Sequence, residues 1–230
     1  MFADACEMLG FGVSASDGSI GVVCDFLFEE TSWIIRYLVV NTSSLQIMGR
    51  RVLISPVSVQ FADRKKRVIG VGLTRDQIIN APGVNLHPTV SFANEMPLAE
   101  YFGWPRYWRQ DAYRDWPFTS ASRLAGLCGA QPEPVPTHLH SVREIVGYKI
   151  RGIDGRIGHV DDFIFSLADW RICRLIVDTR SWLSGRHVAV APEWVTWLQW
   201  SSKTLYVSLT RREIRNAPRC DVESLESAPH

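Results

Sequence analysis

Two aspartates are the residues best placed for unusual acid–base chemistry. Asp25 and Asp162 each stand in an otherwise apolar run of the sequence, and burial raises the pKa of a carboxyl group. A simpler interpretation is structural, because a carboxylate beside a β-bulge can accept the backbone N–H groups that the bulge leaves unpaired. We favour the structural role and expect Asp25 and Asp162 to hold a bend in two strands.

Histidine and cysteine side chains offer few other opportunities for chemistry. His138 and His140 form the only close pair of histidines along the chain, and two ligands without a nearby acid or thiol make a poor metal site. The cysteines show no C-x-x-C spacing, which indicates reduced thiols rather than a zinc site or a redox dithiol. They are Cys6, Cys24, Cys128, Cys173 and Cys220. We therefore predict that no metal is bound.

Motifs typical of catalysis do not occur in the sequence. No serine, cysteine or histidine has the spacing of a nucleophile elbow. No glycine-rich loop leads into a helix, as phosphate binding would require. The sequence therefore predicts no catalytic residues, no bound cofactor and no enzymatic activity.

The segments that contain Asp25 and Asp162 belong to an internal sequence repeat. Residues 10–45 align with residues 147–182, and residues 49–82 align with residues 185–218, with about 28 identities. Duplication is the simplest explanation. Most matched positions are turn residues or apolar strand residues, which have a backbone or packing reason to recur. The clearest are Asp17, Gly18, Gly21, Asp25, Gly49, Pro56, Pro82, Asp154, Gly155, Gly158, Asp162, Gly185, Pro192 and Pro218.

Short β-strands are predicted in both copies. Asp17-Gly18 and Asp154-Gly155 predict tight hairpins of the primed type, because Asp-Gly readily takes the positive φ angles that such turns need. A glycine inside the next strand, Gly21 or Gly158, indicates a bulge or a barrel corner. Strands are expected over residues 19–28, 34–41 and 49–56, and over residues 156–165, 171–178 and 185–192. Short strands at this spacing suggest a small closed barrel in each copy.

Each copy is expected to end with a short capped helix. Thr74 and Gln77, like Thr210 and Glu213, match the capping-box pattern, in which each side chain binds the backbone N–H of the other residue. An Asn-Ala-Pro sequence follows both, and the residue before a proline avoids helical geometry. The helices should therefore stop there.

Taken together, these motifs resemble the PRC-barrel family. The resemblance rests on residues 17–28, 36–40, 49–56 and 73–82, and on their counterparts from Asp154 to Pro218. It implies a compact β-barrel in each copy, used as a docking or adaptor surface without chemistry of its own. The fold class expected is mainly β, with two tandem small PRC-type barrels joined by a partly helical, irregular connector.

The connector is rich in large aromatic residues. The candidate partner-binding residues are Trp104, Arg106, Tyr107, Trp108 and Trp116, because Trp, Tyr and Arg dominate interface hot spots. The alternative, which we favour, is that the rings pack onto an adjacent barrel and join the halves. A proline-rich stretch over residues 128–137 is expected to be an exposed spacer.

The domain organisation follows from the repeat. We expect a first barrel over residues 1–83, the connector over residues 84–144, a second barrel over residues 145–220 and a flexible tail over residues 221–230. Two early acids and no basic region before an apolar run argue against a secretory signal. No apolar run reaches the roughly 18 residues that span a bilayer. We expect a cytoplasmic protein without a transmembrane segment.

Charge limits the possible partners. The chain has 25 Lys and Arg against 24 Asp and Glu, a net charge of +1, so it has no overall field that would hold DNA. A local basic cluster at residues 63–67 could touch the phosphates of RNA or an anionic membrane. The second copy has Gln199 to Lys203 there and lacks this charge. We therefore expect a solvated hairpin tip.

Three functions are compatible with these features. The leading hypothesis is a non-enzymatic scaffold or adaptor that binds protein partners, with homodimerisation possible. The second is an RNA-processing or ribosome-assembly accessory, because a ribosome-maturation factor contains a related barrel and the connector tryptophans could stack on bases. The third, a peripheral subunit or assembly factor of a photosynthetic or electron-transfer membrane complex, rests on the resemblance to the reaction-centre H subunit alone.

Overall fold

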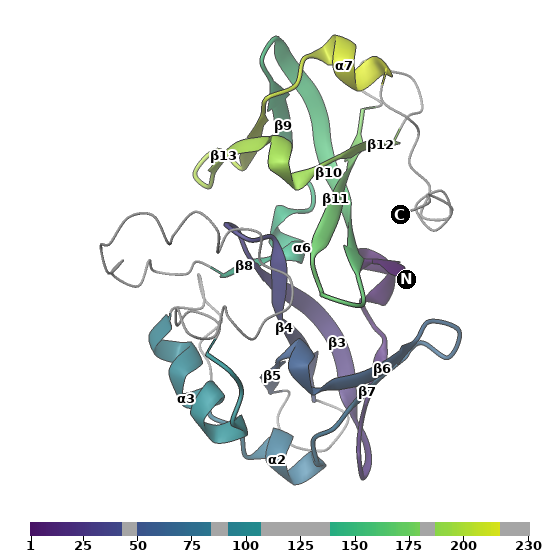
Figure 1. Cartoon of the computed structure of the whole chain (residues 1–230), viewed down its shortest axis with the longest axis vertical. Helices are drawn as coiled ribbons and strands as arrows, with labels where there is room; N and C mark the ends of the chain where they lie inside the picture. Colours follow the sequence, from purple (N-terminus) through teal and green to yellow (C-terminus); the bar gives the residue numbers. More distant parts are fainter. Residues whose placement is uncertain (43–49, 84–91, 107–138, 180–186, 217–230) are drawn as a thin grey trace, which may run out of the picture.

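The chain folds into two separate β-sheets that lie one above the other along the long axis of the molecule (Figure 1). The computed structural model describes residues 1–42, 50–83, 92–106, 139–179 and 187–216. Within them the protein is mainly β, as the sequence predicts. No helix in these ranges is both long and apolar enough to span a membrane.

The first sheet contains six consecutive strands of the first copy, in the spatial order β5-β4-β3-β2-β7-β6. Their bounds are β2 (Gly12–Ala15), β3 (Gly18–Glu29), β4 (Ile34–Asn41), β5 (Arg51–Ile54), β6 (Val59–Asp63) and β7 (Val68–Val71). Neighbours are antiparallel except β2 and β7, which are parallel. A short 3₁₀ turn, η2 (Pro56–Ser58), begins at the proline that ends β5.

The second sheet repeats this order as β12-β11-β10-β9-β14-β13. Its strands are β9 (Lys149–Gly152), β10 (Gly155–Ser166), β11 (Ile172–Asp178), β12 (His187–Val190), β13 (Val195–Gln199) and β14 (Thr204–Val207), with the 3₁₀ turn η3 (Pro192–Trp194) after β12. The parallel pair is again the one between the first and last strands, β9 and β14. Ile20 and Ile157 are fully buried at the same place in both sheets. Within the described ranges, the two end strands of each sheet do not pair with each other: β5 does not pair with β6, and β12 does not pair with β13.

The predicted hairpins are present, but their aspartates have a different role. Gly18 and Gly155 have φ angles of 144° and 135°, whereas neither aspartate has a positive φ, so the turns are not the Asp-Gly turns we expected. Asp17 instead accepts a hydrogen bond of 2.8 Å from the backbone N–H of Arg75, and Asp154 accepts the equivalent bond from Arg211. Each aspartate therefore ties its hairpin to the first residue of the helix that closes the copy.

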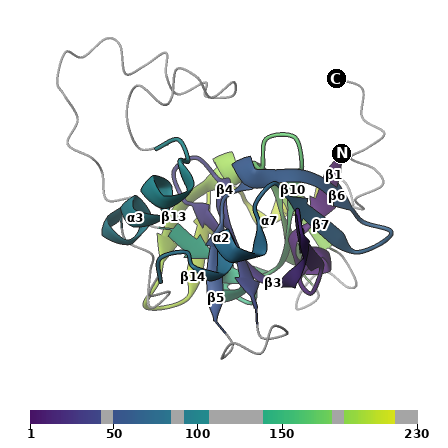
Figure 2. The same ribbon diagram turned by 90° about the horizontal axis from the view of Figure 1, so that it is seen from below.

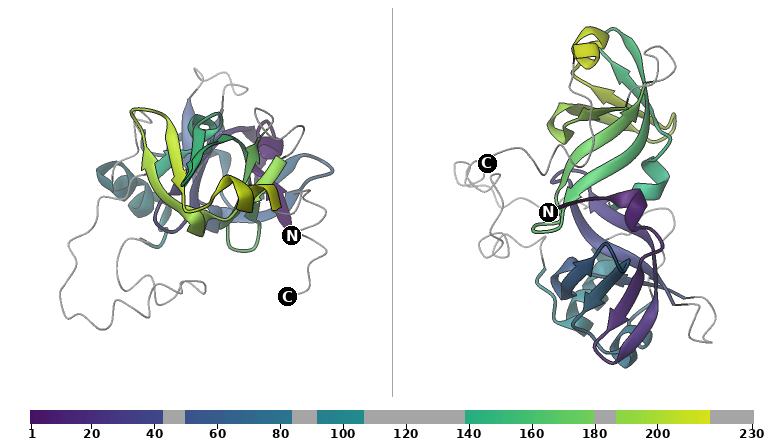
Figure 3. Two further views of the ribbon diagram at one scale, coloured as in Figure 1. Left: turned by 90° about the horizontal axis from the view of Figure 1, so that it is seen from above. Right: turned by 90° about the vertical axis from the view of Figure 1, so that its right-hand side faces the viewer.

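Those helices, α2 (Arg75–Ile79) and α7 (Arg211–Asn216), begin as the capping pattern predicts. The Thr74 hydroxyl accepts the Gln77 N–H at 3.2 Å, and the Gln77 side chain accepts the Thr74 N–H at 2.9 Å. Thr210 and Glu213 make the same two bonds. Helix α2 lies across the outer end of the first sheet (Figure 2), and α7 lies across the outer end of the second (Figure 3).

Gly21 and Gly158 permit a close backbone approach next to a bulge. A Cβ at Gly21 would lie 2.1 Å from the carbonyl oxygen of Asn41, and one at Gly158 would lie 2.0 Å from that of Asp178. The register of the hairpin shifts just before each glycine. The bulge expected beside these glycines is therefore confirmed. Glycine is needed there because the neighbouring strand leaves no room for a Cβ atom.

The two copies exchange short segments, which the sequence did not predict. Strand β1 (Phe2–Asp4) and helix α1 (Ala5–Met8) precede the first copy, yet β1 pairs with β10 of the second. Strand β8 (Leu139–Ser141) and helix α6 (Val142–Ile145) precede the second copy, yet β8 pairs with β3 of the first. Figure 1 shows these segments at the level between the sheets. The repeat therefore extends upstream of residues 10 and 147.

One continuous core joins the halves, in place of two independent cores. Phe26 lies against Phe165 with ring centroids 5.6 Å apart, and Phe28 lies against Phe163 at 5.9 Å. Since Phe163 and Phe165 are the repeat equivalents of Phe26 and Phe28, the two contacts are related by an approximate two-fold axis. All four rings are fully buried. The halves thus bury their hydrophobic surfaces against each other.

The turns after β3 and β10 add reciprocal backbone bonds across this axis. The Ile172 N–H donates to the Trp33 carbonyl at 2.7 Å, and the Ile35 N–H donates to the Trp170 carbonyl at 2.8 Å. Trp33 and Trp170 both have positive φ angles, 56° and 57°, which turn the chain back toward the other half. The junction is therefore built from matched elements of both copies.

Candidate interaction surface and the junctions between the halves

Asp25 holds the junction where β8 and α6 meet β3. One of its oxygens accepts the backbone N–H of Phe26 at 2.8 Å and that of Arg143 at 3.2 Å, and the other accepts the Ser141 hydroxyl. The register of β3 shifts between Val23 and Asp25, so the aspartate stands directly after a bulge. Burial raises the pKa of Asp25, and the hydrogen bonds oppose that shift. As expected, Asp25 stabilises the bulge; it also caps the helix of the exchanged segment.

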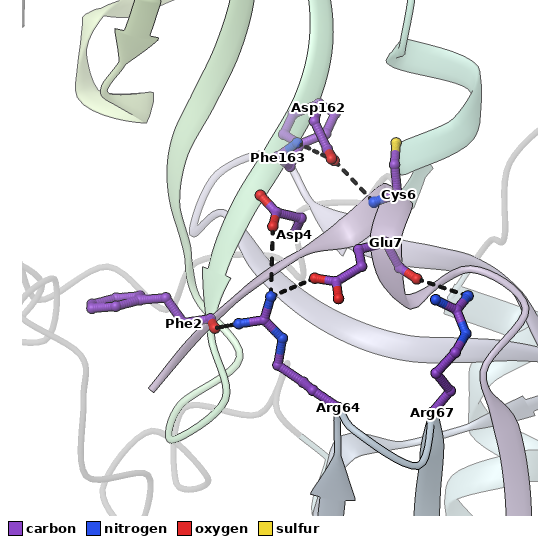
Figure 4. A network of polar contacts seen from close by, with 8 residues as sticks. All are labelled: Phe2, Asp4, Cys6, Glu7, Arg64, Arg67, Asp162 and Phe163. Carbon is purple, nitrogen blue, oxygen red and sulfur yellow. Dashed lines mark hydrogen bonds and ion pairs between the residues drawn. The ribbon is translucent and has the colours of Figure 1, made fainter. Parts of the chain in front are cut away.

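Asp162 has the same position at the other junction. One oxygen accepts the N–H of Phe163 at 2.6 Å and the N–H of Cys6, in α1, at 2.9 Å (Figure 4). Asp4 stands where the first junction has Ser141, so this site contains two acids. Burial, followed by the charge of Asp162, raises the pKa of Asp4 to about 6. Burial also raises the pKa of Asp162.

Arg64 compensates part of this negative charge. Its guanidinium donates to the carboxylate of Glu7 at 2.5 Å and to the Phe2 carbonyl at 3.2 Å, and it lies 4.0 Å from the carboxylate of Asp4 (Figure 4). Arg64 comes from the hairpin between β6 and β7. It therefore holds the N-terminal segment, β1 and α1, against the first half. We call such a contact, which fixes an exchanged segment to its own copy, a latch.

Arg67, at the other end of this basic cluster, also faces the N-terminal segment. Its guanidinium lies 4.7 Å above the ring of Phe11, and Lys203 takes the equivalent position 5.9 Å from the ring of Tyr148. The prediction of a purely solvated hairpin tip is thus wrong for Arg64 and Arg67, because both contact residues before β2. Lys65 and Lys66 are exposed.

The second copy latches its exchanged segment with an aromatic ring. Trp200 has the position equivalent to Arg64 and stacks on His140, with ring centroids 3.8 Å apart and planes 20° apart. His140 is buried, and its Nε2 lies 2.9 Å from the carboxylate of Glu30. His140 is thus part of the packing of β8, and His138 lies outside the described residues.

The described thiols lack the character of reactive nucleophiles. Burial raises the pKa of Cys6 to about 12, and burial also raises the pKa of Cys24 and of Cys173. A thiol attacks as its thiolate, so these three are poorly suited to nucleophilic chemistry at neutral pH. Cys128 and Cys220 lie outside the described residues.

Arg50, which aligns with Arg186 in the repeat, binds backbone carbonyl groups near the end of α2. Its guanidinium donates to the carbonyl of Ile79 at 2.9 Å and to that of Ala81. Both carbonyls lie at the C-terminal end of α2, where unpaired acceptors and the helix dipole favour a cation. Arg186, its counterpart, lies outside the described residues, as do Gly49, Gly185 and Pro218.

A groove lies where the two halves meet on the outside; most of its lining residues are of apolar types, but its exposed surface is more polar than apolar. It has a volume of about 510 Å³ and runs between β6 of the first half and the turn after β10 of the second. Its lining residues are Met1, Pro56, Val57, Val59, Gln60, Phe61, Ala62, Leu167, Ala168, Asp169 and Trp170. Four consecutive residues of β6 line the groove. Because successive side chains of a strand point to opposite faces, the groove runs along the edge of β6 rather than over one face. Strand β6 is also the end of its sheet.

Phe61 is the most exposed ring in this groove, and its repeat equivalent is exposed as well. The Phe61 side chain is 53% exposed, although its ring lies over Gly70, where any Cβ would overlap it. Trp197, at the equivalent place on β13, is 64% exposed, and Trp194 nearby is 41% exposed. Phe61 and Trp197 were not among the partner-binding residues predicted from the sequence. The available signal was an aromatic residue at one position of both copies, on a short strand followed by a turn.

Of the predicted partner-binding residues, Trp104 is buried within the chain. Its indole N–H donates to the Ser58 hydroxyl at 2.8 Å, and its ring stacks on Phe102 with centroids 4.2 Å apart and lies 6.1 Å from the ring of Tyr37. Phe102 ends helix α3 (Phe92–Phe102), and Tyr37 lies in β4. Trp104 therefore packs the start of the connector onto the first sheet, in agreement with the interpretation we favoured.

Of the other candidate residues in the connector, Arg106 alone lies within the described residues. Arg106 makes an ion pair of 2.7 Å with Glu100. Tyr107, Trp108 and Trp116 lie outside the described residues, as does the proline-rich stretch.

No protein-family model matches this chain, and no curated protein matches its sequence.

Proposed function

We propose that this protein is a non-enzymatic scaffold or adaptor of the PRC-barrel type, whose two halves together bind a protein partner. The observation that carries the proposal is the groove between β6 and the turn after β10, because both halves supply its walls and Phe61 is exposed in it. A hollow with an exposed aromatic side chain is typical of an interaction site.

The fold supports the barrel part of this proposal. Both copies have the same six-strand order, one parallel pair between their first and last strands, and a long second strand bent by bulges. Strong bending of one strand brings distant strands of a sheet toward each other, as barrel-like folds require. The resemblance in sequence motifs adds to this argument, and we therefore propose that each half is a barrel of the PRC type.

The partner that fits the groove is an extended, largely apolar peptide segment. Strand β6 is the last strand of its sheet, and none of the described strands pairs with its outer edge, so an added strand could pair there while apolar side chains enter the groove. Phe61 is held by its contact with Gly70, so little conformational freedom is lost when a partner covers it.

The RNA hypothesis receives less support. Arg64 is partly buried against the N-terminal segment, whereas Lys65, Lys66 and Arg67 are exposed. Lys66 lies 3.9 Å from the carboxylate of Asp63, and the Arg67 guanidinium lies over the ring of Phe11. A few exposed cations on one hairpin give a weak, salt-sensitive contact with phosphate. A peripheral role in a membrane complex rests on family resemblance alone.

The decisive experiment is a quantitative pull-down with the full chain and two matched variants. Phe61→Ser removes the exposed ring of the groove. Ile153→Ser removes a more exposed apolar side chain, 73% against 53% for Phe61, in the hairpin before β10 and outside the groove. We expect at least one stoichiometric protein to be lost with Phe61→Ser and kept with Ile153→Ser. Equal recovery of all proteins by both variants, or recovery of RNA that disappears as salt rises, would contradict the proposal.

A further inference from the structure

A row of side chains with metal-binding chemistry crosses three neighbouring strands of the second sheet. His159 on β10 pairs directly with Asp178 on β11, and Asp178 pairs directly with His187 on β12. Directly paired residues of adjacent strands project from the same face. Asp161 follows His159 by two residues and is the extra residue of a β-bulge, since the register shifts between Val160 and Asp162. Four ligand-type side chains therefore gather on one face.

The distances between their polar atoms suit a small tetrahedral ion. His159 Nε2 lies 3.5 Å from Asp178 Oδ2, and His187 Nε2 lies 3.4 Å from Asp161 Oδ2. One ligand atom from each of His159, Asp161 and Asp178 falls within 4.8 Å of the others, whereas His187 lies outside this set and approaches it through Asp161. Bonds of about 2.0–2.1 Å to a tetrahedral ion place its ligand atoms about 3.4 Å apart, so modest side-chain movement would complete the shell.

Burial and charge fit the same conclusion. Asp178 is almost fully buried in the middle of the row, whereas the side chains of His159 and His187 are each 42% exposed. An ion could therefore enter from solvent and meet a carboxylate held in place by the sheet. Two carboxylates and two neutral imidazoles match the charge of a divalent ion. Imidazole ligands favour zinc-like ions over calcium or magnesium.

The first copy provides an internal control with the same backbone. The equivalent row across β3, β4 and β5 contains Val22, Asn41 and Arg51, with Cys24 at the bulge. Arg51 carries a fixed positive charge and cannot bind a metal. The duplicated frame alone therefore does not require a ligand set, and the second copy has acquired one at all four positions.

We propose that His159, Asp161, Asp178 and His187 form a binding site for one divalent transition-metal ion of the zinc type. The ion would tie β12, an end strand of its sheet, to the long central strand β10. This inference is independent of the proposed scaffold function. It replaces the prediction from sequence that no metal is bound, which considered only residues close together along the chain.

The test uses the purified full chain, stripped of metal with a chelator and titrated with ZnCl₂ by calorimetry. The variants copy the first half: His187→Arg and His159→Val, with Asp76→Asn, an exposed acid of α2 in the first half, as the control. We expect one ion per chain, binding weaker by about tenfold or more in both row variants, and unchanged binding in the control. Equal affinity in all four proteins would overturn the proposal.

A second measurement does not depend on any variant. Imidazole resonances of the unmodified chain, followed by NMR during zinc addition, should shift for His159 and His187 and saturate at one equivalent. If zinc binds while these two histidines stay unperturbed, the ion occupies another place, such as a thiol, and the proposal is wrong.

Discussion

At the junction of β8 with β3, Asp25 meets the hydroxyl of Ser141 and Trp200 stacks on His140. At the junction of β1 with β10, Asp162 lies near a second acid, Asp4. The backbone is the same in both: an exchanged strand pairs with the long bent strand, and an aspartate caps the short helix that follows. Only the side chains around that frame differ.

The comparison of the two junctions shows which of their side chains recur and which vary. An aspartate follows the bulge at both junctions, and at each it accepts two backbone N–H groups, one from its own strand and one from the exchanged segment. The latch is free to vary, since either an ion pair through Arg64 or a stacked ring at Trp200 holds the segment in place. The two latches should nevertheless respond differently to salt and pH.

The largest expected effect separates the two capping aspartates. Asp25→Ala leaves the N–H groups of Phe26 and Arg143 and the Ser141 hydroxyl without their acceptor, so we expect a loss of roughly 3 kcal/mol in unfolding free energy. Asp162→Ala also removes two bonds but relieves repulsion with Asp4, so its loss should be about 1–2 kcal/mol. Urea unfolding at neutral pH measures both.

The control for this pair is a conservative change at each site. Asp25→Asn and Asp162→Asn keep an acceptor oxygen, and each should lose less than the corresponding alanine variant. Equal losses in the two alanine variants would mean that the second acid at Asp4 has no energetic consequence.

A smaller effect separates the two latches. Trp200→Ala removes the ring stacked on His140, and we expect a loss of about 2 kcal/mol. Arg64→Ala removes partly exposed ion pairs, and we expect about 1 kcal/mol. Raising NaCl from about 0.05 M to about 1 M should shrink the effect of Arg64→Ala and leave that of Trp200→Ala unchanged. An equal salt response in both variants would refute the distinction between ionic and aromatic latches.

The smallest effect concerns Asp4 and is a gain. Its pKa is 3.8 when unperturbed and about 6 in the fold, so the protonated acid is the form that the fold favours. The stability that this group contributes is full below about pH 4 and is lost as pH rises through about 6. Asp4→Ser, which copies Ser141 of the other junction, should stabilise the chain by roughly 1 kcal/mol at pH of about 8 and have little effect at about 4.

The measurement is thermal or urea unfolding of both proteins across this pH range. A variant that is less stable than the natural chain at about pH 8 would show that the ion pair with Arg64 outweighs the repulsion from Asp162.

The sequence alone determined the features that depend on neighbouring residues. The repeat, strands β3 and β4 with their counterparts, and the capped helices α2 and α7 all follow from turn residues, β-branched runs and caps, which act over a few positions. Gly21 and Gly158 were recognised for the same reason. Even the role of Asp25 as support for a bulge could be inferred, because the bulge and its acceptor are adjacent in the chain.

Tertiary structure alone decided which segments meet. The three-residue strands β1 and β8 carry too little pattern to choose a partner, and they pair with the opposite half because the halves share one core. The contacts of Arg64, the exposure of Phe61, and the row from His159 to His187 also arise only when distant strands are brought into register. Sequence spacing sets local backbone geometry, whereas convergence of distant side chains is set by strand pairing and burial.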